Sequence, residues 1–208
     1  MIALPDLAGL GLFIAAALVL LITPGPAVLY IVARSIDQGR RAGLVSMLGV
    51  HAGTLVHAAA AAAGLSALLA ASAMAFSVVK YLGAAYLIFL GVRRLLDRTT
   101  SVTSSRPERR HLRRAFLDGV VVNVLNPKTA LFFLALLPQF VDSDRGAVWS
   151  QVVTLGLVFV ALGLVSDSIY AFAGDAVGSL LRRRATAMRR VSGSIYIGLG
   201  AVAAFARR

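Results

Sequence analysis

Residues 118–141 read DGVVVNVLNPKTALFFLALLPQFV, an apolar segment long enough to cross a bilayer, with one lysine near its middle. This residue, Lys128, follows directly after Pro127 and lies about 14 residues from Arg114, roughly 20 Å at the rise of an α-helix. A cation at that depth costs at least a few kcal/mol unless something compensates its charge. The sequence therefore predicts a buried partner for Lys128, and a bound anionic group is one candidate.

The rest of the composition is typical of an integral membrane protein. Of the 208 residues, 59% are hydrophobic, against roughly 45–50% in soluble domains. The charged residues cluster and leave four stretches without any charge: 7–33, 42–79, 81–92 and 146–166. All but the third reach the ~20 apolar residues of a spanning helix. The third also does so if Lys80 lies at an interface.

The net charge of +12 does not indicate a nucleic-acid partner. The basic residues lie between apolar spans, where they select membrane topology. The absence of cysteine excludes disulfide, iron–sulfur and thiol-exchange chemistry, and we expect no cofactor. The first apolar run has no basic region before it and is too long for a cleaved signal peptide, so we expect it to be retained as a span.

The apolar pattern predicts six helices, at 7–33, 43–70, 76–96, 115–140, 147–173 and 189–206. One long polar linker, DRTTSVTSSRPERRHLRR at 97–114, divides the chain. We therefore expect a first three-helix repeat at 1–96, a basic cytoplasmic linker at 97–114 and a second three-helix repeat at 115–208.

Basic residues predict the orientation. Sixteen of them fall in the odd-numbered loops or the linker and four on the other side. Arg34, Arg40 and Arg41 are assigned to the first loop in this count. Cytoplasmic loops carry the excess of arginine and lysine, so both termini should face the periplasm or the exterior.

The two halves share a local pattern in their first and fourth spans. Residues 22–30 read ITPGPAVLY and residues 125–133 read LNPKTALFF, which aligns Pro24 with Pro127. Three spans in each half make the second half inverted relative to the first. Matching interrupted segments are the best sequence indication of a transporter site. The prediction is an all-α integral membrane protein of six transmembrane helices, in two inverted three-helix repeats, with helices 1 and 4 broken at proline.

The prolines leave backbone carbonyls without helical donors. Pro127 removes the donor of the Asn123 carbonyl, while Pro24 and Pro26 remove those of Leu20 and Ile22. Each half-helix that begins at a break presents free N–H groups and a positive dipole end, which suits a carboxylate. The alternative is a pair of simple proline kinks. The candidate substrate-binding residues are Thr23, Pro24, Gly25, Pro26, Asn123, Asn126, Pro127 and Lys128.

The order of several motifs resembles one family. They are ITPGPAVLYIVARSIDQGRRAG from residue 22, a helix with Gly49, Gly53 and His57, YLGAAYLIFLGVRRL from residue 81, and NVLNPKTALFFLALLPQFV from residue 123. Together they resemble the LysE/RhtB-type amino-acid exporter family over essentially the whole chain. The resemblance implies a six-helix protein of the bacterial inner membrane that exports amino acids or related metabolites, driven by the proton gradient.

Two further residues are candidates for proton coupling or for an ion pair. Asp167 lies well inside the fifth span, where acids face the interior or a cavity. It could bind an ammonium group, carry a proton or neutralise Lys128. His57 shares a face with Gly49 and Gly53, the small residues of a packed surface. It is either a proton carrier or a hydrogen-bonded structural histidine.

Other polar residues receive simpler interpretations. His51 lies off the glycine face and carries little weight. Asn123 and Asn126 could bind substrate or cap the broken helix. Asp118 can pair with Arg114 one turn away.

The alternatives to an amino-acid exporter have less support. A divalent metal-cation exporter would have only His51, His57 and Asp167 as ligands, beside the positive charge of Lys128, so no metal site is predicted. An intramembrane protease would need Ser166 or Ser168 with His57, and no oxyanion motif accompanies them. With Asp167 as the one central acid, a neutral amino acid is favoured over a dibasic one. A homodimer through Gly49 and Gly53 is an open alternative to packing within the chain.

Overall fold

The computed structural model describes the backbone of residues 7–71 and 112–174, together with single positions between 78 and 96 and between 187 and 201. Within this part of the chain the ordered structure is helical and contains no strand. Most of the predicted spans 76–96 and 189–206, and nearly all of the linker 97–114, lie outside the described residues.

The first span is broken where the prolines predict. Helix α1 covers Leu7–Ile22 and α2 covers Pro26–Gln38, with a bend of 50° between them. Proline fits the first position of a helix because that N–H has no intrahelical acceptor, and Pro26 begins α2 in this way. The break is confirmed, and the second half-helix continues five residues past the predicted end at residue 33.

The fourth span is broken at the matching position. Helix α5 covers Leu112–Val124 and α6 covers Pro127–Leu131, with a bend of 48° between α5 and the segment that α6 opens. The segment continues as a π-helix η1, Phe132–Leu136, and a 3-10 helix η2, Leu137–Phe140. A short 3-10 turn η3, Ser143–Arg145, then leads to the next helix.

Two continuous helices complete the described bundle, α3 at Arg40–Ala71 and α7 at Val148–Phe172. Both are long and apolar enough to cross a membrane, and each bent pair would add one span. Helix α3 crosses α5 closely through the predicted glycine face. A Cβ on Gly49 would overlap the Phe116 carbonyl, and one on Gly53 would lie 2.9 Å from the Val120 carbonyl oxygen. The glycine face therefore packs within the chain.

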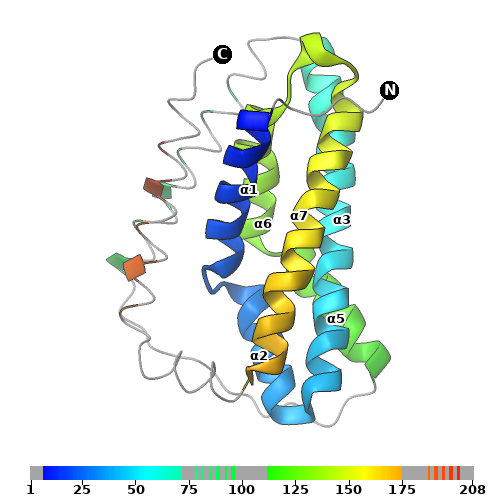
Figure 1. Ribbon diagram of the computed structural model, residues 1–208, viewed down its shortest axis with the longest axis vertical. Helices are drawn as coiled ribbons and strands as arrows, with labels where there is room; N and C mark the ends of the chain where they lie inside the picture. Colours follow the sequence, from blue (N-terminus) through cyan, green and yellow to red (C-terminus); the bar gives the residue numbers. More distant parts are fainter. Residues whose placement is uncertain are drawn as a thin grey trace.

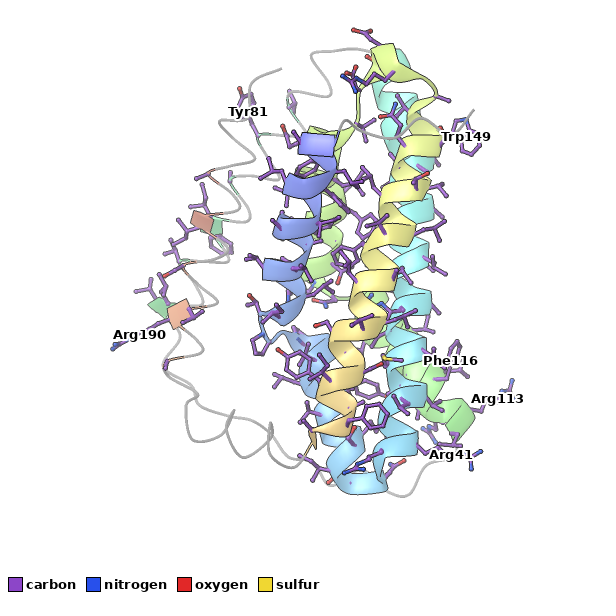
Figure 2. The ribbon with its side chains drawn as sticks, viewed as in Figure 1. Arg41, Tyr81, Arg113, Phe116, Trp149 and Arg190 are labelled. Atoms are coloured by element: carbon purple, nitrogen blue, oxygen red, sulfur yellow. The ribbon has the colours of Figure 1, made fainter. Side chains whose placement is uncertain are left out.

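Figure 1 shows how the broken helices are arranged. Both interruptions lie near mid-height of the bundle, with α1 and α6 in one half and α2 and α5 in the other. The α1–α2 pair runs in the opposite direction to the α5–α6 pair. In Figure 2, Arg41 and Arg113 lie at one end of the bundle, which we call the basic end, and Trp149 lies at the opposite end.

The assignment of Arg34 to the first loop is wrong. The turn between α2 and α3 is the single residue Gly39, which takes φ +86°, a conformation that favours glycine. Arg34 lies inside α2 and is only 4% exposed. Its guanidinium is buried because an acid on α5 faces it, as described below.

Candidate functional site

The two breaks meet in the middle of the bundle. The Lys128 ammonium, from the second break, donates a hydrogen bond to the Thr23 carbonyl in the first. Gly25 makes room for this approach, since a Cβ there would lie 2.9 Å from Lys128 Cδ. Both Lys128 and Thr23 are buried. The buried cation predicted from the sequence is therefore hydrogen-bonded to the backbone of the other half of the chain.

Side chains and a backbone N–H group donate hydrogen bonds to the carbonyls that the prolines leave without a helical donor. Tyr170 of α7 donates to the Ile22 carbonyl at 2.6 Å. His57 Nε2 lies 2.9 Å from the Asn123 carbonyl, and because a carbonyl can only accept, this nitrogen carries the proton. The Leu20 carbonyl accepts from the Thr23 backbone N–H at 3.1 Å. Each of these carbonyls thus has a hydrogen-bond donor, which is needed because nonpolar surroundings offer no water to bind it.

The N-termini of the two central half-helices differ. Asn126 caps α6, because its side chain accepts from the Lys128 N–H at 3.1 Å. Gly25, the N-cap of the 13-residue α2, supplies no side-chain bond. The first N–H groups of a helix have no intrahelical acceptor, and Ala27 and Val28 of that first turn both line the cavity described below. The positive end of α2 is the more available of the two.

Asn123 holds the second break to α3. Its amide nitrogen donates to the Val50 carbonyl and to Thr54 Oγ1, both at 2.9 Å. Its amide oxygen accepts from Thr129 Oγ1 at 2.9 Å and from Asn126 Nδ2 at 3.3 Å. With this full set of partners, Asn123 is a structural connection between the broken helix and its neighbour.

A second buried charged group faces the same region. His51 Nε2 of α3 lies 3.0 Å from Asp167 Oδ2 of α7, and both side chains are 4% exposed. The contact has the distance of an ion pair without the alignment of a hydrogen bond. A Cβ on Gly163, one turn before Asp167, would overlap the His51 ring, so this glycine lets the imidazole lie against α7.

A small cavity of about 30 Å³ lies between these groups. That volume holds one or two water molecules, so an amino acid could enter only if the walls move apart. Leu20, Leu21, Val50 and Phe159 give it an apolar side. Its polar lining comes from four helices and consists of His51, Thr54, Asn123, Asn126, Lys128, Thr129 and Asp167.

On the basic side of the cavity, α2 is closed against α5 by polar contacts. Arg34 Nη2 lies 2.9 Å from Asp118 Oδ2, and the Arg34 guanidinium stacks over the Tyr30 ring at 5.2 Å. The Tyr30 hydroxyl donates to the Ala115 carbonyl at 2.7 Å. Asp118 therefore pairs across to α2, a partner that the sequence did not predict.

The other side is closed by aromatic packing. Phe13 of α1 contacts Phe132 and Phe140, with ring centroids 5.7 and 5.3 Å apart. Phe132 also packs on Phe159 of α7 at 4.6 Å. These rings are nearly inaccessible to solvent. An ion pair thus joins α2 to α5 towards the basic end, and apolar rings pack together towards the other.

The predicted site residues divide into three groups. Gly25, Asn123, Asn126, Lys128 and Asp167 line the cavity. Thr23 and Pro24 form the first break, and Pro26 and Pro127 begin the half-helices with exposed rings. His57 is not among the lining residues; it bonds to Asn123 and stacks on Phe133.

The residue that sequence reasoning missed is His51. Its position off the glycine face indicates little in the sequence, but that face packs on α5 and leaves other faces of α3 for the cavity. The available signal was a second polar residue, Thr54, one turn later in a charge-free span. Both residues line the cavity.

The residues required by the alternative functions do not assemble. Within the described ranges, no group of three or more His, Cys, Asp or Glu side chains could hold a metal ion. His57 is engaged by Asn123 rather than by Asp167. Ser168, a candidate nucleophile, donates to the Leu164 carbonyl of its own helix at 2.6 Å.

Known proteins similar to this chain agree with the transporter interpretation. A membrane protein of Vibrio cholerae is 32% identical over 94% of this chain and 96% of its own length. A homoserine/homoserine lactone efflux protein of Salmonella typhimurium is 29% identical over 89% of this chain and 91% of its own. No solved structure matches significantly. The model of the LysE type translocator family matches residues 18–207. The chain therefore belongs to the LysE type translocator family, whose members are membrane proteins.

Proposed function

We propose that the protein exports small amino acids, or close derivatives, from the cytoplasm across the bacterial inner membrane. The observation that carries the proposal is the contact between the two breaks, where the Lys128 ammonium of one half donates to the Thr23 carbonyl of the other beside a cavity. A substrate carboxylate would replace Thr23 as the partner of Lys128. The uncapped N-terminus of α2 adds N–H donors and a positive dipole end.

The substrate is proposed to have an uncharged side chain. The cavity lining contains one acid, Asp167, and one lysine, so a dibasic amino acid would find no second carboxylate there. The efflux relative from Salmonella, named for homoserine and its lactone, supports a small polar substrate.

The proposed architecture is six spans in two inverted three-helix repeats, 1–96 and 115–208, joined by the cytoplasmic linker 97–114. The opposite directions of the α1–α2 and α5–α6 pairs support it (Figure 1). Arg41 and Arg113 at one end of the bundle support a cytoplasmic basic end (Figure 2). The proposed orientation places both chain termini on the opposite side of the membrane. Alternating access would open the polar closure and the aromatic closure in turn.

Export is proposed to be coupled to proton entry through Asp167. This carboxylate is buried in the cavity and so can exchange a proton when either side opens. His57 was the second candidate, but its Nε2 proton is engaged by the Asn123 carbonyl. We assign it a structural role.

Counterflow in proteoliposomes tests the proposed function. Vesicles loaded with an unlabelled amino acid should accumulate the same labelled compound, and a panel of neutral, basic and acidic amino acids identifies the class. Lys128→Met should lower counterflow of the free amino acid at least about tenfold, the factor for one lost charge-assisted bond, while the protein remains folded. No counterflow with any member of the panel would refute the proposed substrate class.

A further inference from the structure

Two residues that line the cavity carry buried polar atoms without partners. His51 Nδ1, His51 Nε2 and Asp167 Oδ1 have no hydrogen-bond partner in the described structure. Both side chains are 4% exposed and both residues line the cavity. Buried polar groups are almost always paired in native proteins. Two side chains with unpaired polar atoms in one cavity therefore indicate a ligand that carries hydrogen-bond donors.

The chemistry of these two atoms selects the kind of donor. When the His51 proton is on Nε2, the nitrogen that lies 3.0 Å from Asp167 Oδ2, Nδ1 is a bare acceptor. Asp167 Oδ1 is an acceptor with a negative charge. An ammonium group carries three N–H donors and a positive charge, so it matches both atoms at once.

Lys128 of α6 also lines the cavity and carries a positive charge, opposite to that of Asp167. It has no ion pair with Asp167 among the described residues; its ammonium bonds to the Thr23 carbonyl instead. The two charges thus line one cavity without neutralising each other directly. A molecule with a carboxylate and an ammonium on one carbon can satisfy both walls, whereas a simple acid or amine satisfies one.

We propose that His51 and Asp167 form the ammonium end of a two-ended site for zwitterions, with Lys128 and the N-terminus of α2 at the carboxylate end. This rests on the proposed function and names its substrate class as α-amino acids with both charged groups free. His51 is a positioning residue that adds a second acceptor beside the carboxylate. Gly163 is required because any larger residue would displace the imidazole.

Blocking each charge of the substrate in turn tests the proposal. The probes are L-threonine and L-leucine, each as the free amino acid, the methyl ester and the N-acetyl derivative, in competition counterflow assays. The wild-type protein should prefer the free amino acid over either derivative by at least about tenfold, the factor expected for one charge-assisted bond.

The variants should remove one preference each. Asp167→Asn and His51→Leu should bring the preference over the N-acetyl compound close to one and largely keep the preference over the ester. Lys128→Met should do the reverse. Ser168→Ala is the control, because Ser168 does not line the cavity and bonds within α7. Both preferences should persist in that variant.

Folding is checked by thermal unfolding in detergent. If Asp167→Asn does not fold, Gly163→Ala displaces His51 without removing a charge and should also lower the preference over the N-acetyl compound. Gly11→Ala is its control, since nothing lies within 4 Å of a Cβ there.

Three outcomes oppose the proposal and can be told apart. Equal transport of the N-acetyl compound and the free amino acid by wild type overturns the two-ended site. A loss of both preferences together in Asp167→Asn overturns the assignment of the ammonium end. Counterflow of the methyl esters and N-acetyl compounds without the free amino acids overturns the zwitterion class but keeps export, whereas no counterflow at all removes the proposed function itself.

Discussion

Tyr170 donates its hydroxyl hydrogen to the carbonyl oxygen of Ile22, 148 residues earlier, at a distance of 2.6 Å. That carbonyl is one that Pro26 deprives of a helical donor. A side chain of the second half of the chain therefore stabilises the interruption in the first half. In the second break, His57 of the first half bonds to the Asn123 carbonyl, which also accepts from the Asn126 backbone N–H at 3.0 Å.

Replacing Tyr170 with phenylalanine should therefore destabilise the protein by about 1–3 kcal/mol, because the bond lies on the outside of the bundle, where lipid offers the freed carbonyl no other donor. Tyr30→Phe is the matched comparison. Its hydroxyl also donates to a carbonyl, that of Ala115, but this carbonyl lies within the regular helix α5 and keeps its helical donor. Thermal unfolding should show the larger loss for Tyr170→Phe. Equal losses would mean that the freed carbonyl needs no partner.

His57→Leu should lower stability by less than Tyr170→Phe, because the Asn123 carbonyl keeps the Asn126 N–H as a donor, and should leave the pH dependence of transport unchanged. The physical reason is that Nε2 serves the Asn123 carbonyl and the ring packs on Phe133. The measurement is initial export rate against pH for the folded fraction of each protein. A flattened pH profile in His57→Leu would instead make His57 the proton carrier.

Gly49→Ala should be strongly destabilising, by about 1–3 kcal/mol or more, as for other overpacked sites. The added Cβ meets the backbone of Phe116 rather than a flexible side chain, so α3 and α5 must separate. Gly64→Ala, with nothing within 4 Å of its Cβ, serves as the control on the same helix. The free energy of unfolding in a mixed-micelle titration provides the comparison. Similar values for the two variants would disprove the close crossing.

Asp118→Asn should open the cavity towards the basic end, because it weakens the ion pair that closes α2 on α5. The chain contains no cysteine, so Ala27→Cys provides a single thiol beside the cavity. Labelling by a membrane-impermeant maleimide added on the basic side should become faster in Asp118→Asn. The exchanged pair Arg34→Asp with Asp118→Arg should slow it again.

Asp142→Asn is the control for this experiment. Asp142 also pairs with an arginine, Arg145 at 3.4 Å, but that pair is exposed and lies in the η3 turn. It should not change the labelling rate. An unchanged rate in Asp118→Asn as well would show that the ion pair does not gate access.

The positions of the breaks were predictable because proline acts locally. Pro24, Pro26 and Pro127 remove specific donors whatever surrounds them, and the structure bends where they occur. The depth of Lys128 followed from counting residues along the span. These features need no knowledge of how the helices pack.

The partners of the site were not predictable, because they depend on helix rotation and crossing. His51 and Asp167 are 116 positions apart, and only the packing of α3 on α7 brings them to 3.0 Å. The pairing of Arg34 with Asp118 arises in the same way from α2 and α5. Asn123 and Asn126 had two equally good interpretations until their hydrogen bonds were known.

The opposite formal charges of Lys128 and Asp167 have a consequence for energetics across the bilayer. Moving one elementary charge through a potential of 100 mV changes the free energy by roughly 2.3 kcal/mol. With a neutral imidazole on His51 and an ionised Asp167, the charged residues lining the cavity sum to zero, and a zwitterionic cargo preserves that balance. Under the proposed coupling, the export step would move no net cavity charge through the membrane potential, and the return step would carry one proton on Asp167. Any electrical current that accompanies turnover would come from the coupled proton.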